Sequence, residues 1–218
     1  MEVKTRRYDN RRRTQHARRT RTAVLDAART LFLARGYAGT SIRDVADLAG
    51  VSFPTVYATV GNKVALLSAV FDVSVAGDDE PVSMAERADV QVAEQNPDPR
   101  VTLAAYTRQV CAAAVRVWPI LQLIDEAGRA HPEVAELGRK TREELLTGVR
   151  RLARNLADKR ALRDGLTVEK AADILWMFGI GVIYDALVKH RHWTPRELET
   201  WVNASLDQLI LAPTKVDF

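Results

Sequence analysis

Apolar residues recur at helical spacing early in the chain and predict a helix that ends at a glycine. Between residues 22 and 36, intervals of three and four residues place these apolar side chains on one helical face: Val24, Leu25, Ala28, Leu31 and Phe32. Gly36 is expected to end the helix, since glycine enters the left-handed conformation at little cost. This face would supply part of a small helical core.

Two shorter helices separated by a tight turn are expected next. Ser41 and Asp44 have the spacing of a capping pair, and the residues after Ser41 repeat an apolar face over about two turns. Gly50 would open the turn. Ser52 suits the N-cap of the following helix, and Pro54 fits its first turn, where a missing N–H costs nothing. Two short helices joined in this way form a helix-turn-helix.

The middle of the chain predicts longer helices. A fourth helix is expected to start near Asn62, and an apolar face runs over residues 101–117. Pro119 is expected to break or kink the chain, with a short helix over residues 121–130 after it. Pro132 suits the first turn of a long helix whose other face carries charged residues, so that face should meet water.

The last two predicted helices are apolar on more than one side. Residues 167–189 have apolar side chains nearly all round the helix, and residues 198–210 carry a broad apolar stripe. Each helix could pack one side on its own chain and the other on a symmetry mate, forming a four-helix dimer interface. The alternative is a monomeric core. The expected interface residues are Trp176, Val182, Ile183, Leu187, Trp201 and Leu206.

Composition narrows the class to an all-α protein. The 218 residues include 47% apolar side chains, few glycines and prolines, and no clear strand-like alternation. The one cysteine, Cys111, fits a reducing compartment and is expected to be a small buried side chain rather than a redox sensor. We find no apolar run of membrane-spanning length and no signal peptide, so a cytoplasmic protein is expected.

Positive charge is concentrated at the N-terminus. Residues 1–21 contain nine basic and two acidic residues, a net charge of +7, whereas the whole chain has a net charge of +4. A basic segment of this kind can neutralise phosphates or place arginine in a minor groove. The alternative is a solvated, disordered tail. We therefore predict a basic flexible arm over 1–19, a helix-turn-helix domain over 20–75, and a helical domain over 76–218.

The helix-turn-helix region resembles a known family. The run RGYAGTSIRDVADLAGVSFPTVYATVGNKVALL is similar to the DNA-binding domain of tetracycline-repressor (TetR) family transcriptional regulators. Phe53-Pro54 and Val60 depart from the residues usual at those positions. The matching positions are Gly36, Thr40, Ser41, Ile42, Val45, Ala46, Ala49, Gly50, Val51, Ser52, Thr55, Tyr57, Lys63, Leu66 and Leu67.

The resemblance implies a DNA-contacting surface. Ser52, Phe53, Thr55 and Tyr57 would face DNA from the recognition helix, where methyl, aromatic and hydroxyl groups can meet base edges. Thr40, Ser41 and Arg43 would touch phosphates, and Lys63 would hold an oxyanion at the start of the fourth helix. The arm residues expected to contact DNA are Arg18, Arg19 and Arg21.

Aromatic residues of the C-terminal half are the one hint of a ligand. They could line a cavity between helices, because ligand pockets favour apolar and aromatic walls, or they could simply be core. These candidates are Tyr106, Trp118, Trp176, Met177, Phe178 and Tyr184. Cofactors, metal sites and catalytic residues are not expected: His190 and His192 make a poor metal site, and no phosphate loop, nucleophile elbow or paired-acid motif is present.

The residues and the resemblance together favour a homodimeric transcriptional regulator rather than an enzyme. It would bind an inverted-repeat operator in double-stranded DNA, most simply as a repressor released by a small apolar effector, with no membrane association. An activator, an effector-independent regulator and a helical protein-interaction module are the alternatives.

Overall fold

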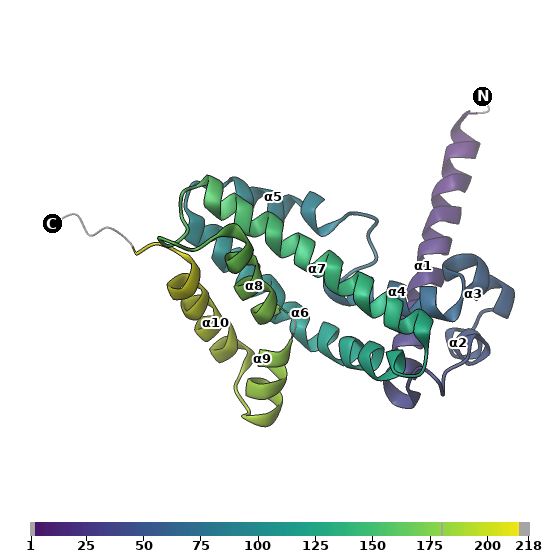
Figure 1. Cartoon of the computed structure of the whole chain (residues 1–218). Coiled ribbons are helices and arrows are strands. Elements are labelled where there is room, and N and C mark those ends of the chain that lie inside the picture. Colours follow the sequence, from purple (N-terminus) through teal and green to yellow (C-terminus); the bar gives the residue numbers. More distant parts are fainter. Residues whose placement is uncertain (1–2, 180, 214–218) are drawn as a thin grey trace. The chain divides into compact units, whose positions relative to one another are not determined.

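The computed structural model describes residues 3–179 and 181–213, with side chains from residue 13 onward, and all regular elements in this part are helices (Figure 1). The first four are α1 (Val3–Arg35), α2 (Ile42–Ala49), α3 (Phe53–Val60) and α4 (Lys63–Ala76). The next five are η1 (Met84–Glu86), α5 (Ala88–Gln95), α6 (Pro99–Gly128), α7 (Pro132–Asp158) and α8 (Val168–Gly179). The last three are α9 (Val182–Tyr184), the π-helical segment η2 (Asp185–His190) and α10 (Pro195–Ile210). The all-α prediction is confirmed.

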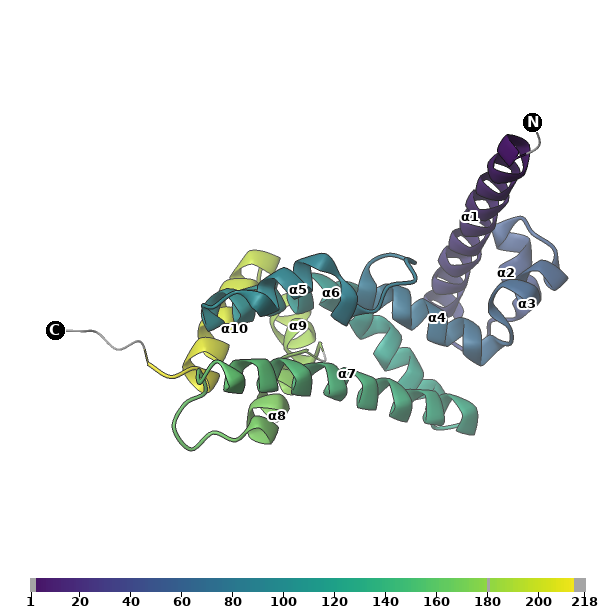
Figure 2. The same cartoon turned by 90° about the horizontal axis from the view of Figure 1, so that it is seen from above.

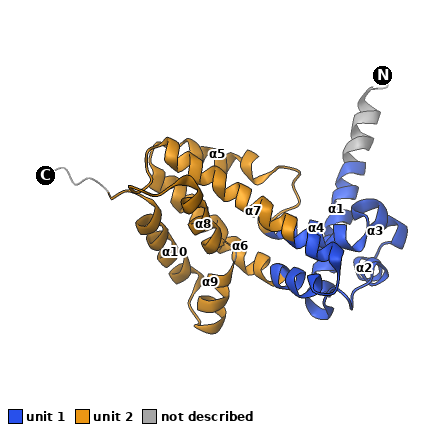
Figure 3. Cartoon of the chain, in the orientation of Figure 1, with its two compact units in different colours: residues 1–74, 120–138 blue, residues 75–119, 139–218 orange. Residues whose placement is uncertain are grey.

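The chain forms two compact units (Figure 3). Unit 1 comprises Met1–Ser74 and Ile120–Gly138, and unit 2 comprises Val75–Pro119 and Arg139–Phe218. The segments predicted from the sequence are continuous stretches, whereas residues 120–138, which belong to the predicted helical domain 76–218, group with the first 74 residues. Both α6 and α7 therefore begin in one unit and end in the other.

Unit 1 is built on the core that the early apolar pattern predicted. Helix α1 packs against α2 and α3, and the side chains with no exposed surface include Val24, Phe32, Val45 and Val56. The N-terminal part of α1 projects beyond α2 and α3 (Figure 2), and the side chains of residues 13–19 are exposed. The segment predicted as an arm is thus continuous with α1, while its flexibility stays a prediction and its first twelve side chains lie outside the described part.

Unit 2 has its own apolar core. Side chains from α6, α7, α8 and α10 pack together, with Leu156, Leu175, Leu206 and Ile210 completely buried. The long helix expected after Pro132 is confirmed as α7. Among the described residues, no single helix is long and apolar enough to cross a membrane, and two bent helix pairs match such a span in length and composition only.

Two expected helix boundaries were wrong. Pro119 lies inside the continuous helix α6, so no break and no separate short helix follow it. Proline removes one helical hydrogen bond, and the buried side chains of Ile120, Leu121 and Ile124 stabilise the turns after it. Conversely, the helix expected over 167–189 is interrupted after Gly179. Gly181 has a φ of 83°, a left-handed conformation that glycine adopts without strain.

Candidate nucleic-acid interface

The start of α2 is fixed by reciprocal hydrogen bonds between Ser41 and Asp44. The Ser41 hydroxyl accepts from the Asp44 backbone N–H at 3.1 Å, and the Ser41 backbone N–H donates to Asp44 Oδ2 at 2.9 Å. The Ser41 hydroxyl also donates to Asp44 Oδ2 at 2.6 Å, and these bonds hold the pKa of Asp44 below its usual value. This capping box confirms the spacing argument. Gly50 ends α2 with a φ of 66°.

Helix α3 presents one face to the core and one to solvent. Ser52 caps it by accepting from the Thr55 N–H at 3.3 Å, and the two hydroxyls lie 2.7 Å apart. Val56 is completely buried, whereas Phe53 and Tyr57 are 44% and 54% exposed. An exposed pair of large aromatic side chains on a short helix is costly in water, so this face is available to a partner.

Helix α2 contributes a cation to this aromatic face. The guanidinium carbon of Arg43 lies 6.0 Å from the ring centre of Phe53, and the rings of Phe53 and Tyr57 are 6.2 Å apart. Exposed side chains that carry positive charge, aromatic rings and hydroxyls therefore come together across the turn. This combination can meet phosphates and base edges.

Thr40 is placed differently from the expectation. Its side chain is 2% exposed, its hydroxyl donates to the Gly36 carbonyl at 2.9 Å, and its backbone N–H donates to the Tyr37 carbonyl at 3.2 Å. A phosphate cannot reach a side chain that is buried in this way, whereas the neighbouring Ser41 is exposed. We therefore remove Thr40 from the proposed phosphate contacts.

The three arm arginines differ in their surroundings. Arg21 is half-buried, and its guanidinium donates to the carbonyl of Thr59 at 3.3 Å, which joins α1 to the end of α3. Arg18 and Arg19 are exposed on the turn of α1 before it. Arg21 thus lies close to the recognition helix and helps to hold it in place.

Lys63 belongs to a cluster that the sequence analysis missed. Its ammonium lies 4.2 Å from the ring centre of Tyr37, and that ring packs edge-on against His131 with centres 5.1 Å apart. Burial lowers the pKa of Lys63, and the nearby charges of Glu133 and Asp44 oppose that shift. The apolar pattern gave no signal for this contact, because His131 and Glu133 lie far along the chain at the start of α7 and only the tertiary fold brings them together.

Four of the predicted ligand residues, Tyr106, Trp176, Phe178 and Tyr184, are partly buried against the unit 2 core. The Tyr106 hydroxyl donates to the Leu175 carbonyl at 2.8 Å, and burial raises the pKa of Tyr106 above its usual range. Phe178 instead packs against Trp201, with ring centres 6.0 Å apart. Met177 is half exposed, and Tyr184 is partly buried beside the unit 2 core.

Two of these residues have an unusual environment. Among the residues that the structure describes, the indole nitrogens of Trp118 and Trp176 are buried and have no hydrogen-bond partner. A buried N–H without an acceptor costs about 1–3 kcal/mol, so such groups are rare in native structures. Each indole is therefore a donor available to a water molecule or to a ligand.

The residues expected at a dimer interface divide into exposed and buried positions. Val182 and Trp201 are 47% and 41% exposed, and Trp176, Ile183 and Leu187 are partly buried. Leu206 is completely buried in the core of its own unit, so it has no surface for a second subunit, and we remove it from the proposed interface. A shallow pocket on this side is lined by Trp193, Thr194, Arg196, Glu197, Thr200, Trp201 and Ala204.

Cys111 behaves as the sequence suggested. It is a free, partly buried thiol packed against the unit 2 core, and burial raises its pKa to about 11, with Glu199 contributing. The thiolate, which is the reactive form, is thus scarce near neutral pH.

Comparisons with known proteins place the chain among bacterial regulators. Residues 24–70 match the family model described as "Bacterial regulatory proteins, tetR family". The chain is 25% identical over 214 residues to the HTH-type transcriptional regulator TtgR of Pseudomonas putida, covering 93% of this chain and 97% of TtgR.

Two solved structures share the fold. Native NalD of Pseudomonas aeruginosa, the secondary repressor of the MexAB-OprM multidrug efflux pump, superposes with a TM-score of 0.68 at 20% identity, over 89% of this chain and 98% of NalD. The transcriptional regulator FadR of Bacillus subtilis, in complex with stearoyl-CoA, has a TM-score of 0.66 at 16% identity, over 85% of this chain and 96% of FadR.

The matched region begins within α1 and ends within α4, so it includes all of α2, the turn and α3. Members of this family are DNA-binding regulators rather than enzymes. The capped α2, the glycine turn and the exposed face of α3 are the features that such a protein needs to read a duplex. Residues 24–70 therefore form a DNA-binding domain of the tetR family of bacterial regulatory proteins, and the chain as a whole is similar to HTH-type transcriptional regulators.

Proposed function

We propose that this protein is a homodimeric repressor that binds an inverted-repeat operator and is released from it by a small, mainly apolar molecule. The exposed face of α3 carries the proposal: Phe53 and Tyr57 point to solvent while Val56 faces the core. Residues 20–75 would read DNA, and residues 76–218 would dimerise and bind the effector.

Contacts to bases and contacts to phosphates would come from different residues. Ser52, Phe53, Thr55 and Tyr57 would face the major groove from α3, with the aromatic rings and the Thr55 methyl group near thymine methyls. The phosphate contacts would come from Ser41, Arg43, Lys63, Arg18, Arg19 and Arg21. The first group would set sequence preference, and the second would set affinity and register.

Dimerisation is supported by apolar surface that the chain leaves uncovered. Met177 and Val182 lie near the end of α8 and in α9, Trp201 and Leu209 lie on α10, and each is more than 40% exposed. Exposed apolar side chains clustered on the same elements mark an interaction surface. A second copy of the chain is the proposed partner, because a two-fold dimer matches two half-sites of an inverted repeat.

An effector is supported by the unpaired indole N–H groups of Trp118 and Trp176. A ligand that combines an apolar body with a hydrogen-bond acceptor would satisfy one or both donors. Binding would lower operator affinity if the ligand prefers a conformation in which the two α3 helices no longer fit the half-sites.

Salt dependence of DNA binding tests this proposal. Affinity for a duplex, measured by fluorescence anisotropy, should fall at least tenfold between about 50 and 200 mM salt, because several phosphate contacts displace counterions. The affinity loss should be smaller for a variant in which Arg43 and Lys63 are both replaced by alanine. An affinity that does not change with salt concentration, or no binding to any duplex at low salt, would contradict the proposal.

A further inference from the structure

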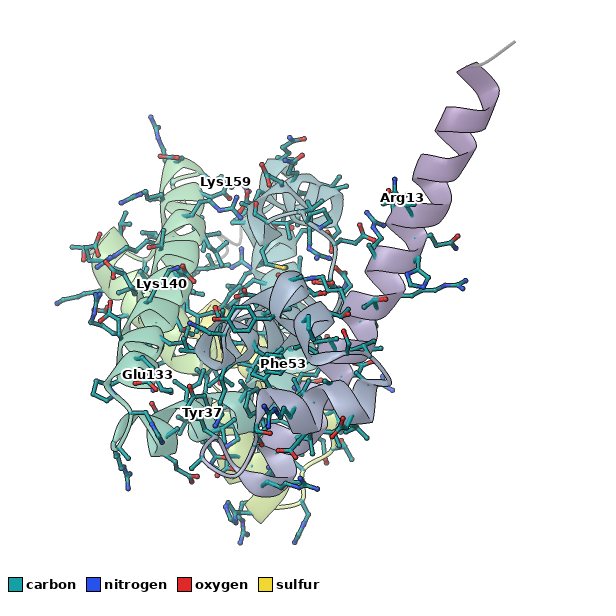
Figure 4. The ribbon with its side chains drawn as sticks, turned by 90° about the vertical axis from the view of Figure 1, so that its right-hand side faces the viewer. Arg13, Tyr37, Phe53, Glu133, Lys140 and Lys159 are labelled. Atoms are coloured by element: carbon teal, nitrogen blue, oxygen red, sulfur yellow. The ribbon has the colours of Figure 1, made fainter. Side chains whose placement is uncertain are left out.

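We propose that Glu133, on the first turn of α7, competes with the DNA phosphate for Lys63 and so limits the affinity of this protein for DNA. The inference rests on the proposed contact between Lys63 and a phosphate, and it adds an internal anion that the phosphate must displace. Lys63, Tyr37, His131 and Glu133 all belong to unit 1 (Figure 4 shows Tyr37 and Glu133).

The Lys63 ammonium is held in place by the ring of Tyr37. Tyr37 is 6% exposed and packs against Phe32 with ring centres 6.0 Å apart, so its ring is fixed. The Lys63 ammonium lies 4.2 Å from the centre of that ring, a distance at which the ring quadrupole attracts the cation. The charge that would meet a phosphate is thus held against Tyr37 rather than swinging freely in solvent.

The Tyr37 ring is also in contact with the residues at the start of α7. The Tyr37 ring contacts His131, whose Nδ1 lies 3.7 Å from Oε1 of Glu133. The Tyr37 hydroxyl is hydrogen-bonded to Glu133, and burial together with this carboxylate raises the pKa of Tyr37. Glu133 is therefore held on the same tyrosine that supports Lys63.

Glu133 also acts on Lys63 through its charge. The charge of Glu133 stabilises the Lys63 ammonium and opposes the lowering of its pKa by burial. A phosphate that binds Lys63 comes close to the same carboxylate and is repelled by it. Glu133 thus stabilises the charged form of Lys63 in the free protein and weakens the contact between Lys63 and a phosphate in the DNA complex.

The position of Glu133 is fixed by the packing of the start of α7. Val134 and Leu137 anchor the start of α7 in unit 1, and a Cβ on Gly128 would lie 3.1 Å from the Ala135 backbone, so the ends of α6 and α7 are closely packed. Helix α7 continues without interruption into unit 2. Glu133 and Lys63 are thus held within the same compact unit.

The test replaces the charge but keeps the hydrogen bond. Glu133→Gln retains an acceptor for the Tyr37 hydroxyl, and we expect it to bind a mixed-sequence duplex about three- to tenfold more tightly than the wild type at low salt. Glu133→Lys should bind more tightly still. Both gains should shrink as salt rises, and the gain of Glu133→Gln should be largely lost when Lys63 is also replaced by alanine.

The matched controls are Glu144→Gln and Glu144→Lys. Glu144 is an exposed residue of the same helix, paired with Lys140, and it lies eleven residues, or about 16 Å, further along the axis. These variants change the net charge equally and should alter affinity much less. Thermal unfolding of each variant separates a folding defect from a binding effect.

Two results would overturn the inference. Glu133→Gln and Glu133→Lys that bind as the wild type does, or more weakly, would show that Glu133 does not compete with phosphate. If the Glu133 and Glu144 variants gain the same DNA affinity, the change in net charge alone would explain the effect. In both cases a wild-type protein that binds DNA leaves the proposed function standing, whereas a wild type without DNA binding removes the proposed function itself.

Discussion

The hydroxyl of Tyr106 in α6 donates a hydrogen bond to the carbonyl of Leu175 in α8, and the distance between the two oxygens is 2.8 Å. Gly179 lies one turn further along α8, where an added Cβ would come within 2.9 Å of the same hydroxyl. Tyr106 thus holds one partner on α8 and requires glycine at the end of that helix, directly before the interruption.

This geometry predicts a dependence between two substitutions. Gly179→Ala should destabilise the protein by about 1–3 kcal/mol, because the new methyl group collides with a fixed hydroxyl. Tyr106→Phe should cost about 1–3 kcal/mol by leaving the Leu175 carbonyl without its donor. Urea unfolding of the double variant should show a total cost below the sum of the single costs, and strict additivity would contradict the collision.

The proposed division of labour at the DNA predicts two classes of variant. Tyr57→Ala and Thr55→Ala should each weaken binding to a selected operator by about 1–3 kcal/mol and change binding to random DNA much less. Lys63→Ala should weaken both by a similar amount, because a phosphate contact carries no sequence information. Equal losses on operator and random DNA for all three variants would show that the roles are not divided.

The exposed and buried positions of the C-terminal helices predict opposite outcomes for the same substitution. Val182→Glu places a charge at an exposed site, so the chain should remain folded and elute as a monomer. Leu206→Glu places a charge in the core, where an unpaired carboxylate costs several kcal/mol, so the chain should unfold. Size-exclusion chromatography with circular dichroism distinguishes these results, and a dimeric Val182→Glu protein would exclude Val182 from the interface.

The unpaired indoles predict which ligands bind. Titration with an amphiphile that carries a carbonyl group should change tryptophan emission and lower DNA affinity. Trp118→Phe or Trp176→Phe should then weaken binding of that ligand by about 1–3 kcal/mol and leave binding of a plain hydrocarbon of similar size unchanged. If neither replacement changes binding of the carbonyl compound, the indole donors do not serve an effector.

The sequence predicted local structure well where short-range rules apply. Ser41, Gly50 and Ser52 act through neighbours within a few residues, and the structure has the caps and the turn that their spacing predicts. Such short-range rules do not predict tertiary contacts. The burial of the Thr40 hydroxyl and the burial of Leu206 depend on how helices pack, which a repeating apolar pattern does not determine.

The errors in the long helices have the same origin. Pro119 was expected to interrupt a helix, but the buried residues after it outweigh one lost hydrogen bond. A different helix, the one expected over residues 167–189, is interrupted beside Gly181, where an added Cβ would come within 3.0 Å of the Trp118 side chain. The contact between Lys63 and Tyr37, with Glu133 beside them, was missed because it joins residues distant in sequence.

Selection of bound sequences from a random DNA pool tests the central claim most directly. A dimeric reader with one α3 helix per subunit should enrich an inverted repeat whose half-sites lie about one helical turn of DNA, or a multiple of it, apart. The Phe53→Ala and Tyr57→Ala double variant should lose that enrichment while keeping weak, salt-sensitive binding. A pool without any enriched sequence, or one enriched for a single site bound by one chain, would contradict the account.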